Sequence, residues 1–203
     1  MKPRPDPSAT TPLSLAITGL DDNGAGIAAQ DELMVHVARA LPGEQITAAL
    51  THTSPHRKAD GRRDAWGELQ AIAVSSPDRV APVCAAYGRC GGCVLQHLAP
   101  AAQAAWKRSR VEAALAEVLR GAGDGGKPVE VSPCVPSPQS LGYRNQAKYV
   151  VGRAANGRPI LGAFAPRSHD VVDLAGCRLG EAPQDAIATW LRDWLETHAV
   201  PPD

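Results

Sequence analysis

The sequence predicts a mainly β fold with helices, of the α+β class. In the first third of the chain, short apolar stretches with alternating residues are separated by turn signals, a pattern typical of strands joined by tight turns. Two longer stretches, at about 100–120 and 183–198, are typical of helices, and the first carries apolar residues at helical spacing. More strand patterns lie between them, so a second, mixed domain is expected after the first.

Five short strands are expected within about sixty residues near the N-terminus. Their expected ranges are 13–20, 26–29, 33–38, 45–52 and 65–73. The turns between them include 21–24 and 41–44, which contain Asp, Asn, Gly and Pro. Short strands with tight turns at this spacing favour a small closed barrel over residues 11–74.

The rest of the chain, residues 75–203, is expected to form the second domain, whereas the Pro-rich, polar residues 1–10 are expected to be disordered. The first helix has Pro100 at its first turn and Gly121 at its end, both favourable positions. Further strands are expected at 129–135, 146–152, 159–164 and 170–174, before the last helix.

Composition limits the partners that this chain can bind. Lysine plus arginine number 21, as do aspartate plus glutamate, so the net charge is zero. A nucleic acid must therefore be bound by local basic patches and not by bulk charge. No apolar run is long enough to span a bilayer, and the N-terminus lacks the apolar region of a signal peptide. We expect a cytoplasmic protein without a membrane partner.

Three cysteines lie close together in a C-x5-C-x2-C run formed by Cys84, Cys90 and Cys93. Glycines within the run supply the backbone freedom that such a tight wrap needs. In a cytoplasmic chain, this pattern favours metal or redox chemistry over disulfides. Three thiols with a fourth from elsewhere in the fold can hold an iron–sulfur cluster, and a tetrahedral zinc site is the nearest alternative.

Several short motifs follow one another along the chain. The barrel region contains Ile17-Thr18-Gly19-Leu20, Gly24-Ala25-Gly26-Ile27-Ala28, Val35-His36-Val37 and Ala40-Leu41-Pro42-Gly43-Glu44. Downstream are Cys90-Gly91-Gly92-Cys93-Val94-Leu95-Gln96-His97-Leu98, Tyr143-Arg144-Asn145, Arg167-Ser168-His169 and Cys177. The first set resembles a TRAM domain, an OB-like RNA-binding barrel. The second set is similar to the iron–sulfur motifs of the 5-methyluridine RNA methyltransferases, in order and spacing from about residue 10 to residue 200.

This resemblance implies a class I, S-adenosyl-L-methionine-dependent enzyme of the 23S ribosomal RNA uracil-C5 type. Such an enzyme has a TRAM barrel, here 11–74, a central iron–sulfur domain, here 75–203, and a Rossmann-like catalytic domain. The resemblance also implies a 4Fe–4S cluster held by Cys84, Cys90, Cys93 and Cys177. Because Cys177 matches the family pattern, it is preferred as the fourth ligand, and Cys134 is expected to be a buried, inert thiol in a strand.

In this family a cysteine thiolate adds to C6 of uracil, and C5 then accepts the methyl group and loses its proton. No G-x-G-x-x-G loop joins a strand to a helix in this chain, because the glycine-dense stretch 121–126 follows a helix. We therefore assign no catalytic residue and no S-adenosyl-L-methionine-binding residue. The chain resembles the N-terminal portion of the enzyme, with an incomplete central domain, and is expected to be inactive alone.

Two groups of residues are candidate RNA contacts. Basic side chains in a loop at 56–63, beside the barrel, can contact phosphates, and these are Arg57, Lys58, Arg62 and Arg63. In the second group, arginine can bind phosphate or a base edge and tyrosine can stack on a base, and its members are Tyr143, Arg144, Asn145 and Lys148. Ordinary solvated charges are the alternative for both groups.

Other motif residues have structural explanations as well as functional ones. The stretch 167–169 can position RNA or brace the cysteine loop, and the alternative is a structural histidine that is hydrogen-bonded to the backbone. His97 is expected to pack or cap the next helix, because four thiols already complete the ligand set. Trp190 and Trp194, four residues apart on one helix face, are expected to be core or to pack against a further domain.

The leading functional hypothesis is an RNA methyltransferase that acts on ribosomal RNA, because the transfer-RNA members of the superfamily mostly lack the barrel and the cluster. We expect it to be a monomer. The alternative is a non-catalytic TRAM/iron–sulfur RNA-binding module, and a zinc-ribbon-like binding protein is a third hypothesis. Radical-SAM methylthiotransferases resemble the chain less, since their C-x3-C-x2-C triad precedes the TRAM barrel.

Overall fold

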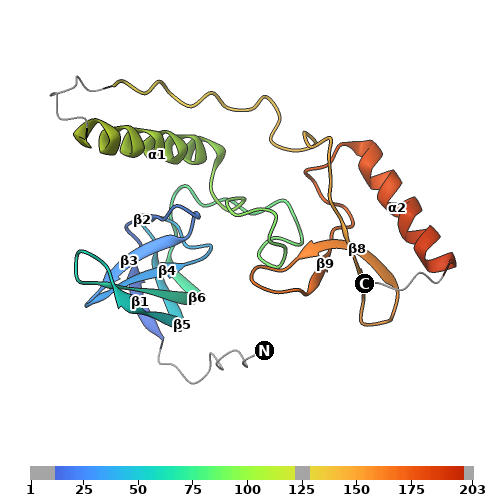
Figure 1. Cartoon of the computed structure of the whole chain (residues 1–203), viewed down its shortest axis with the longest axis horizontal. Helices are drawn as coiled ribbons and strands as arrows, with labels where there is room; N and C mark the ends of the chain where they lie inside the picture. The colour runs from blue at the N-terminus through green and yellow to red at the C-terminus, as the bar shows by residue number, and fades with distance from the viewer. Residues whose placement is uncertain (1–11, 122–128, 199–203) are drawn as a thin grey trace. The chain divides into compact units, whose positions relative to one another are not determined.

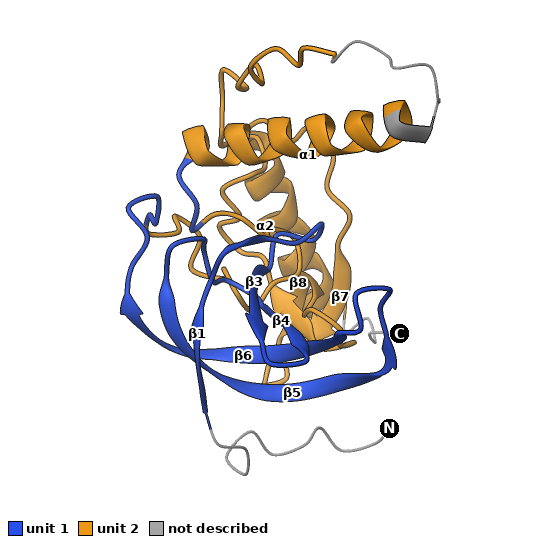
Figure 2. Cartoon of the chain, turned by 90° about the vertical axis from the view of Figure 1, so that its left-hand side faces the viewer, with its two compact units in different colours: residues 1–80, 97–99 blue, residues 81–96, 100–203 orange. Residues whose placement is uncertain are grey.

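The computed structural model describes residues 12–121 and 129–198 (Figure 1). It contains two compact units, which Figure 2 colours separately. Unit 1 comprises residues 1–80 and 97–99, and unit 2 comprises residues 81–96 and 100–203. The segment 1–10, predicted to be disordered, lies outside the described residues. Among the helices that the structure describes, none is long and apolar enough to cross a membrane.

Unit 1 is built from one six-stranded sheet. Its strands are β1 (Leu13–Ala16), β2 (Gly19–Leu20), β3 (Gly26–Gln30), β4 (Leu33–Val37), β5 (Gln45–Arg57) and β6 (Arg63–Val74), in the order β1-β5-β6-β4-β3-β2. The pair β4–β6 is parallel and the other pairs are antiparallel. The strands at the two ends of this order, β1 and β2, are separated in the chain by only Ile17 and Thr18. The sheet therefore closes on itself, which agrees with the predicted barrel.

The barrel core is small and aliphatic. Alternation along β4 buries Val35 and Val37 completely and leaves His36 between them on the other face. Leu15 and Ile46 join the same core. Gly26 is required where β3 passes close to a turn, because a Cβ there would lie 2.8 Å from the Ala40 carbonyl oxygen and 2.9 Å from a methyl carbon of Ile17.

The basic hairpin of the barrel differs from the prediction. The loop expected at 56–63 is shorter, because β5 continues to Arg57 and β6 begins at Arg63. Register shifts interrupt the β5–β6 pairing, including one between Leu50 and His52 and one between Thr53 and Arg57. Such bulges let a long strand bend around a barrel, and they also break the alternation by which a strand is recognised in a sequence.

Unit 2 contains the helix α1 (Pro100–Gly121) and a small sheet covered by a second helix. The antiparallel sheet has the order β7 (Val150–Arg153), β8 (Pro159–Phe164) and β9 (Val171–Asp173), and the helix is α2 (Ala182–Thr197). Leu161 of β8 packs with Ala188 and Leu195 of α2 to form a second core. The two helices and the strand at 159–164 lie where the sequence predicts them.

Two predictions for unit 2 are wrong, and one alternative of a third is wrong. Residues 129–135 form no strand, since Pro133 and Pro136 supply no backbone N–H donors in this stretch. Cys134 within it is accordingly half-buried in irregular chain and not buried in a strand. Trp190 and Trp194 are 65% and 41% exposed, so the core alternative is wrong for both, and α2 instead turns Ala188 and Leu195 toward the sheet. Their packing against a further domain stays a prediction.

Candidate metal centre

The cysteine-rich segment of unit 2 is folded by consecutive turns. The backbone N–H of Tyr87 donates to the Cys84 carbonyl at 3.0 Å, and that of Cys90 donates to the Ala86 carbonyl at 2.9 Å. Gly88 makes the reversal with a φ of +81°, which disfavours other residues. These turns bring Cys84 and Cys90 back toward each other, as the C-x5-C spacing predicts.

The cysteine loop is tied to the end of β8. The Gly91 N–H donates to the carbonyl oxygen of Phe164 at 3.3 Å, and a Cβ on Gly91 would lie 3.1 Å from that same oxygen. The Gly92 N–H donates to the Cys90 sulfur at 3.2 Å. Both glycines of Cys-Gly-Gly-Cys thus have a local role: one permits close backbone packing and the other hydrogen-bonds a thiol.

Cys177 comes from the turn that follows β9. Its N–H donates to the Leu174 carbonyl at 3.0 Å, and Gly176, with a φ of +70°, forms the bend. All four predicted ligands, Cys84, Cys90, Cys93 and Cys177, are half-buried and line one cavity of about 90 Å³. The structure therefore brings the remote cysteine to the other three. Cys134 is not among the residues that line this cavity.

The thiols interact with one another across the cavity. Burial raises the pKa of the Cys93 thiol, and the neighbouring thiols of Cys177, Cys90 and Cys84 raise it further, against a hydrogen bond from Gln96 that lowers it. Gln96 also accepts a hydrogen bond from the Cys84 N–H at 3.3 Å. In residues 12–121 and 129–198, no group of three or more Cys, His, Asp or Glu side chains is placed so that it could hold a metal ion.

Basic side chains line the same cavity. They are Arg144, Lys148 and Arg178. Arg144 is fixed through its backbone, since its N–H donates to the Leu179 carbonyl at 2.9 Å and its carbonyl accepts from the Glu181 N–H at 3.2 Å. Of the other candidate RNA contacts in this unit, Tyr143 is 50% exposed and Asn145 is exposed, and neither lines the cavity.

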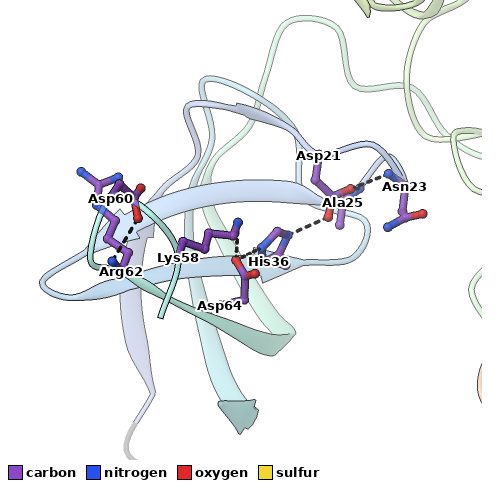
Figure 3. A network of polar contacts seen from close by, with 8 residues as sticks. All are labelled: Asp21, Asn23, Ala25, His36, Lys58, Asp60, Arg62 and Asp64. Carbon is purple, nitrogen blue, oxygen red and sulfur yellow. Dashed lines mark hydrogen bonds and ion pairs between the residues drawn. The ribbon is translucent and has the colours of Figure 1, made fainter. Parts of the chain in front are cut away.

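Some of the candidate RNA-binding side chains of the barrel form ion pairs with carboxylates. Arg57 pairs with Glu32 at 2.7 Å, and Lys58 pairs with Asp64 at 2.7 Å. Figure 3 shows that Lys58 shares Asp64 with His36, whose other ring nitrogen lies 2.7 Å from Asp21. Arg62 is half-buried, and its N–H donates to the Asp60 carboxylate.

His97 does not belong to the cysteine site. Its side chain is 1% exposed within unit 1, and its carbonyl accepts a hydrogen bond from the Val80 N–H at 2.9 Å. Burial lowers the pKa of His97 to about 4, and the positive charge of Arg79 contributes in the same direction. The imidazole is therefore neutral at physiological pH and is buried in unit 1. The predicted packing or capping of the next helix stays a prediction.

Two features were missed by reasoning from sequence. Arg178 was not selected, although it directly follows Cys177 and this adjacency was its available signal. Three rings on neighbouring strands of the barrel also stack in a row. The centroids of His36 and Trp66 are 5.6 Å apart, and those of Trp66 and His52 are 5.4 Å apart. Only the cross-strand register, which pairs both histidines with Trp66, reveals this row.

Comparison with known proteins connects these features to a family. No family model matches the chain. A protein of Listeria innocua named as an uncharacterized RNA methyltransferase is 32% identical over 190 residues, which is 94% of this chain and 39% of the relative. A protein of Clostridium tetani with the same description is 32% identical over 187 residues, 92% of this chain and 38% of the relative. Over nine tenths of its length, this chain is therefore similar to proteins named as RNA methyltransferases.

A third RNA methyltransferase relative, from Geobacter sulfurreducens, is 34% identical over 90% of this chain and 34% of its own length. The chain thus spans little more than a third of the RNA methyltransferases that it matches. The comparison confirms the RNA methyltransferase family that the order of the motifs indicates.

Proposed function

We propose that this chain is the RNA-binding and iron–sulfur part of an S-adenosyl-L-methionine-dependent RNA methyltransferase that modifies C5 of a uridine, in ribosomal RNA. The observation that carries the proposal is the convergence of Cys84, Cys90, Cys93 and the remote Cys177 on one cavity in a homologue of RNA methyltransferases. Residues 11–74 supply the TRAM barrel of this proposal.

The four cysteines around the cavity are the donor set that a 4Fe–4S cluster uses, although in the described residues their side chains are not placed so that they could hold a metal ion. Four cysteines are the usual ligand set of such a cluster. A single buried water molecule needs a cavity of only about 10–15 Å³, so a cavity of about 90 Å³ has room for a group of several atoms. When bound, the cluster supplies a covalent link between the loop at 84–93 and the turn after β9. Methyl transfer requires no electron transfer, so the proposed role of this link is structural.

RNA contacts are proposed on both units. In unit 2, Tyr143 offers an exposed ring on which an unstacked base can stack, next to the exposed Asn145 amide. Arg144 and Lys148 add positive charge on the same stretch of chain. In unit 1, the hairpin residues Arg62 and Arg63 supply phosphate contacts, and Arg57 and Lys58 contribute less because they are paired with carboxylates.

Methyl transfer itself is proposed for the whole enzyme and not for these 203 residues, in which we assign no catalytic residue. A filter assay with labelled S-adenosyl-L-methionine and ribosomal RNA measures this directly. The expected result is no incorporation by this chain. Incorporation by the purified chain would show that it holds a nucleophile and a methyl-donor site of its own.

Anaerobic purification tests the cofactor. The protein is expected to be brown and to contain about four irons per chain, as four thiolates match a four-iron cluster. Cys90→Ser is expected to abolish the colour, and Cys134→Ser, a matched substitution outside the cavity, is expected to keep it. A colourless protein that contains one zinc per chain would contradict the iron–sulfur cluster and indicate a zinc site.

A further inference from the structure

Three basic residues that have no carboxylate partner among the described residues line the cysteine cavity. Arg144, Lys148 and Arg178 line it, and in the described part of the chain none of the three forms an ion pair. Some other arginines of the described chain differ in this respect. Those paired with a carboxylate include Arg57, Arg79, Arg108, Arg158 and Arg192. In a chain of zero net charge, this local excess indicates an anionic occupant.

The four thiols supply that negative charge when they are ligands. Cysteine binds metal as the thiolate. Four thiolates more than balance the charge of an iron–sulfur core, so the assembled site is an anion. A nearby cation stabilises such an anion, and more strongly at a half-buried site than in water.

Of the three basic residues, Arg178 is the one adjacent in sequence to a proposed ligand. It directly follows Cys177, in the segment that begins with the Leu174–Cys177 turn and continues to the bridge between Arg144 and Gly180. The Gly142 N–H donates to the Arg178 carbonyl at 2.9 Å, so its backbone is fixed on the stretch that also carries Arg144. Arg178 is an exposed residue and is among those that line the cavity.

We propose that Arg178, supported by Arg144 and Lys148, is the counter-charge of the thiolate-bound cluster, and that it sets the stability and the reduction potential of that cluster. This inference rests on the proposed cluster. Arg178 acts through the cluster, so it is a positioning residue and not a catalytic one. A reduced cluster carries one more negative charge than an oxidised one, so a neighbouring cation favours the reduced form.

The test compares three variants of the anaerobically purified chain. Arg178→Gln removes the charge, Arg178→Lys keeps it, and Arg153→Gln removes an exposed arginine of β7 that does not line the cavity. The readouts are the midpoint potential, from a redox titration followed by electron paramagnetic resonance, and the rate of iron loss to a chelator. Affinity for a single-stranded ribosomal RNA loop is measured in parallel.

Arg178→Gln is expected to shift the midpoint potential to a more negative value and to lose iron roughly tenfold faster, the size expected for one lost charge interaction at a partly solvated site. Arg178→Lys and Arg153→Gln are expected to behave like the unmodified protein. If Arg178→Gln does not fold, Lys148→Gln is measured instead, with the same expected direction of both shifts.

Three results would overturn the inference. If Arg178→Gln and Arg153→Gln have the same potential and the same iron loss, Arg178 is not the counter-charge, although the cluster itself stands. If Arg178→Gln weakens RNA binding at an unchanged potential, the basic side chain serves a phosphate of the RNA. If the unmodified protein binds no iron, the proposed cluster and this inference both fail.

Discussion

The guanidinium group of Arg79 donates hydrogen bonds to both carboxylate oxygens of Glu44, at 2.6 and 2.8 Å, and this carboxylate is fully buried. The Leu41 N–H at 2.9 Å and the Ser76 N–H at 3.2 Å donate to the same group. Burial alone would raise the pKa of Glu44, but the hydrogen bonds from Arg79, Leu41 and Ser76 outweigh it, and the net pKa lies below its usual value. The pair joins the start of β5 to the chain that follows β6.

Glu44→Ala is expected to destabilise the protein by about 3 kcal/mol, because it leaves a partly buried guanidinium group and two N–H donors without their acceptor. Urea unfolding measures the loss. Glu32→Gln, which breaks the exposed ion pair with Arg57, is the control and should change stability little. Equal effects of the two substitutions would show that the buried pair contributes no more than a surface pair.

His97 is expected to make the stability depend on pH. Since the pKa of His97 is lowered from 6.5 to about 4 in the folded chain, the unfolded chain binds more protons between these values. Neutral His97 therefore contributes its full share of the free energy of unfolding above pH 6.5. As the pH falls toward 4, the free energy of unfolding decreases by up to roughly 3 kcal/mol.

The comparison of His97→Gln with the unmodified protein, by urea unfolding between pH 5 and 7, isolates this contribution. The variant is expected to be less stable at pH 7 and to show a flatter pH profile. Parallel profiles of the two proteins would mean that His97 is not buried in its neutral form.

The parts of this fold that were predictable carry regular local patterns. The strand at 159–164 is bounded by turn residues and the helix at 100–121 has apolar residues at helical spacing, so both were placed from sequence. The extension of β5 to Arg57 was not predictable, because bulges break its alternation. The stretch 129–135 contains three valines, which favour a strand, but Pro133 within it supplies no backbone N–H for a strand ladder.

In the cysteine site, too, the local features were predictable from sequence and the non-local ones were not. The C-x5-C-x2-C run is local, so its three thiols were expected to converge, whereas the choice of Cys177 over Cys134 depended on a family resemblance. The cavity agrees with that choice, because it includes Cys177 and not Cys134. The basic lining could not be derived from sequence, since Arg144 and Arg178 are 34 positions apart and their two stretches are paired only in the fold, through the bridge between Arg144 and Gly180.

Gly162→Ala is expected to destabilise unit 2 by roughly 1–3 kcal/mol, the usual cost of an added group in a packed site. A Cβ at Gly162 would overlap the Val172 carbonyl oxygen and lie 2.6 Å from a methyl carbon of Val171, so β9 would have to move away from β8. Urea unfolding of the full chain measures this. Gly157→Ala is not a suitable control because its φ is +82°, whereas Ala163→Ser, at the neighbouring position, adds a group of similar size.

Tyr143→Ala is expected to weaken binding of a single-stranded RNA loop by roughly tenfold, because stacking of one base on an aromatic ring contributes about 1–3 kcal/mol. The side chain is 50% exposed and lies outside the cysteine cavity, so the substitution should leave the iron content unchanged. Tyr143→Phe keeps the ring and is the matched control, and it should bind like the unmodified protein. Duplex RNA of the same length should be affected less, because its bases are already stacked. Equal losses on loop and duplex RNA, or no loss on either, would remove Tyr143 from the proposed RNA surface, and fluorescence anisotropy at fixed salt measures both affinities.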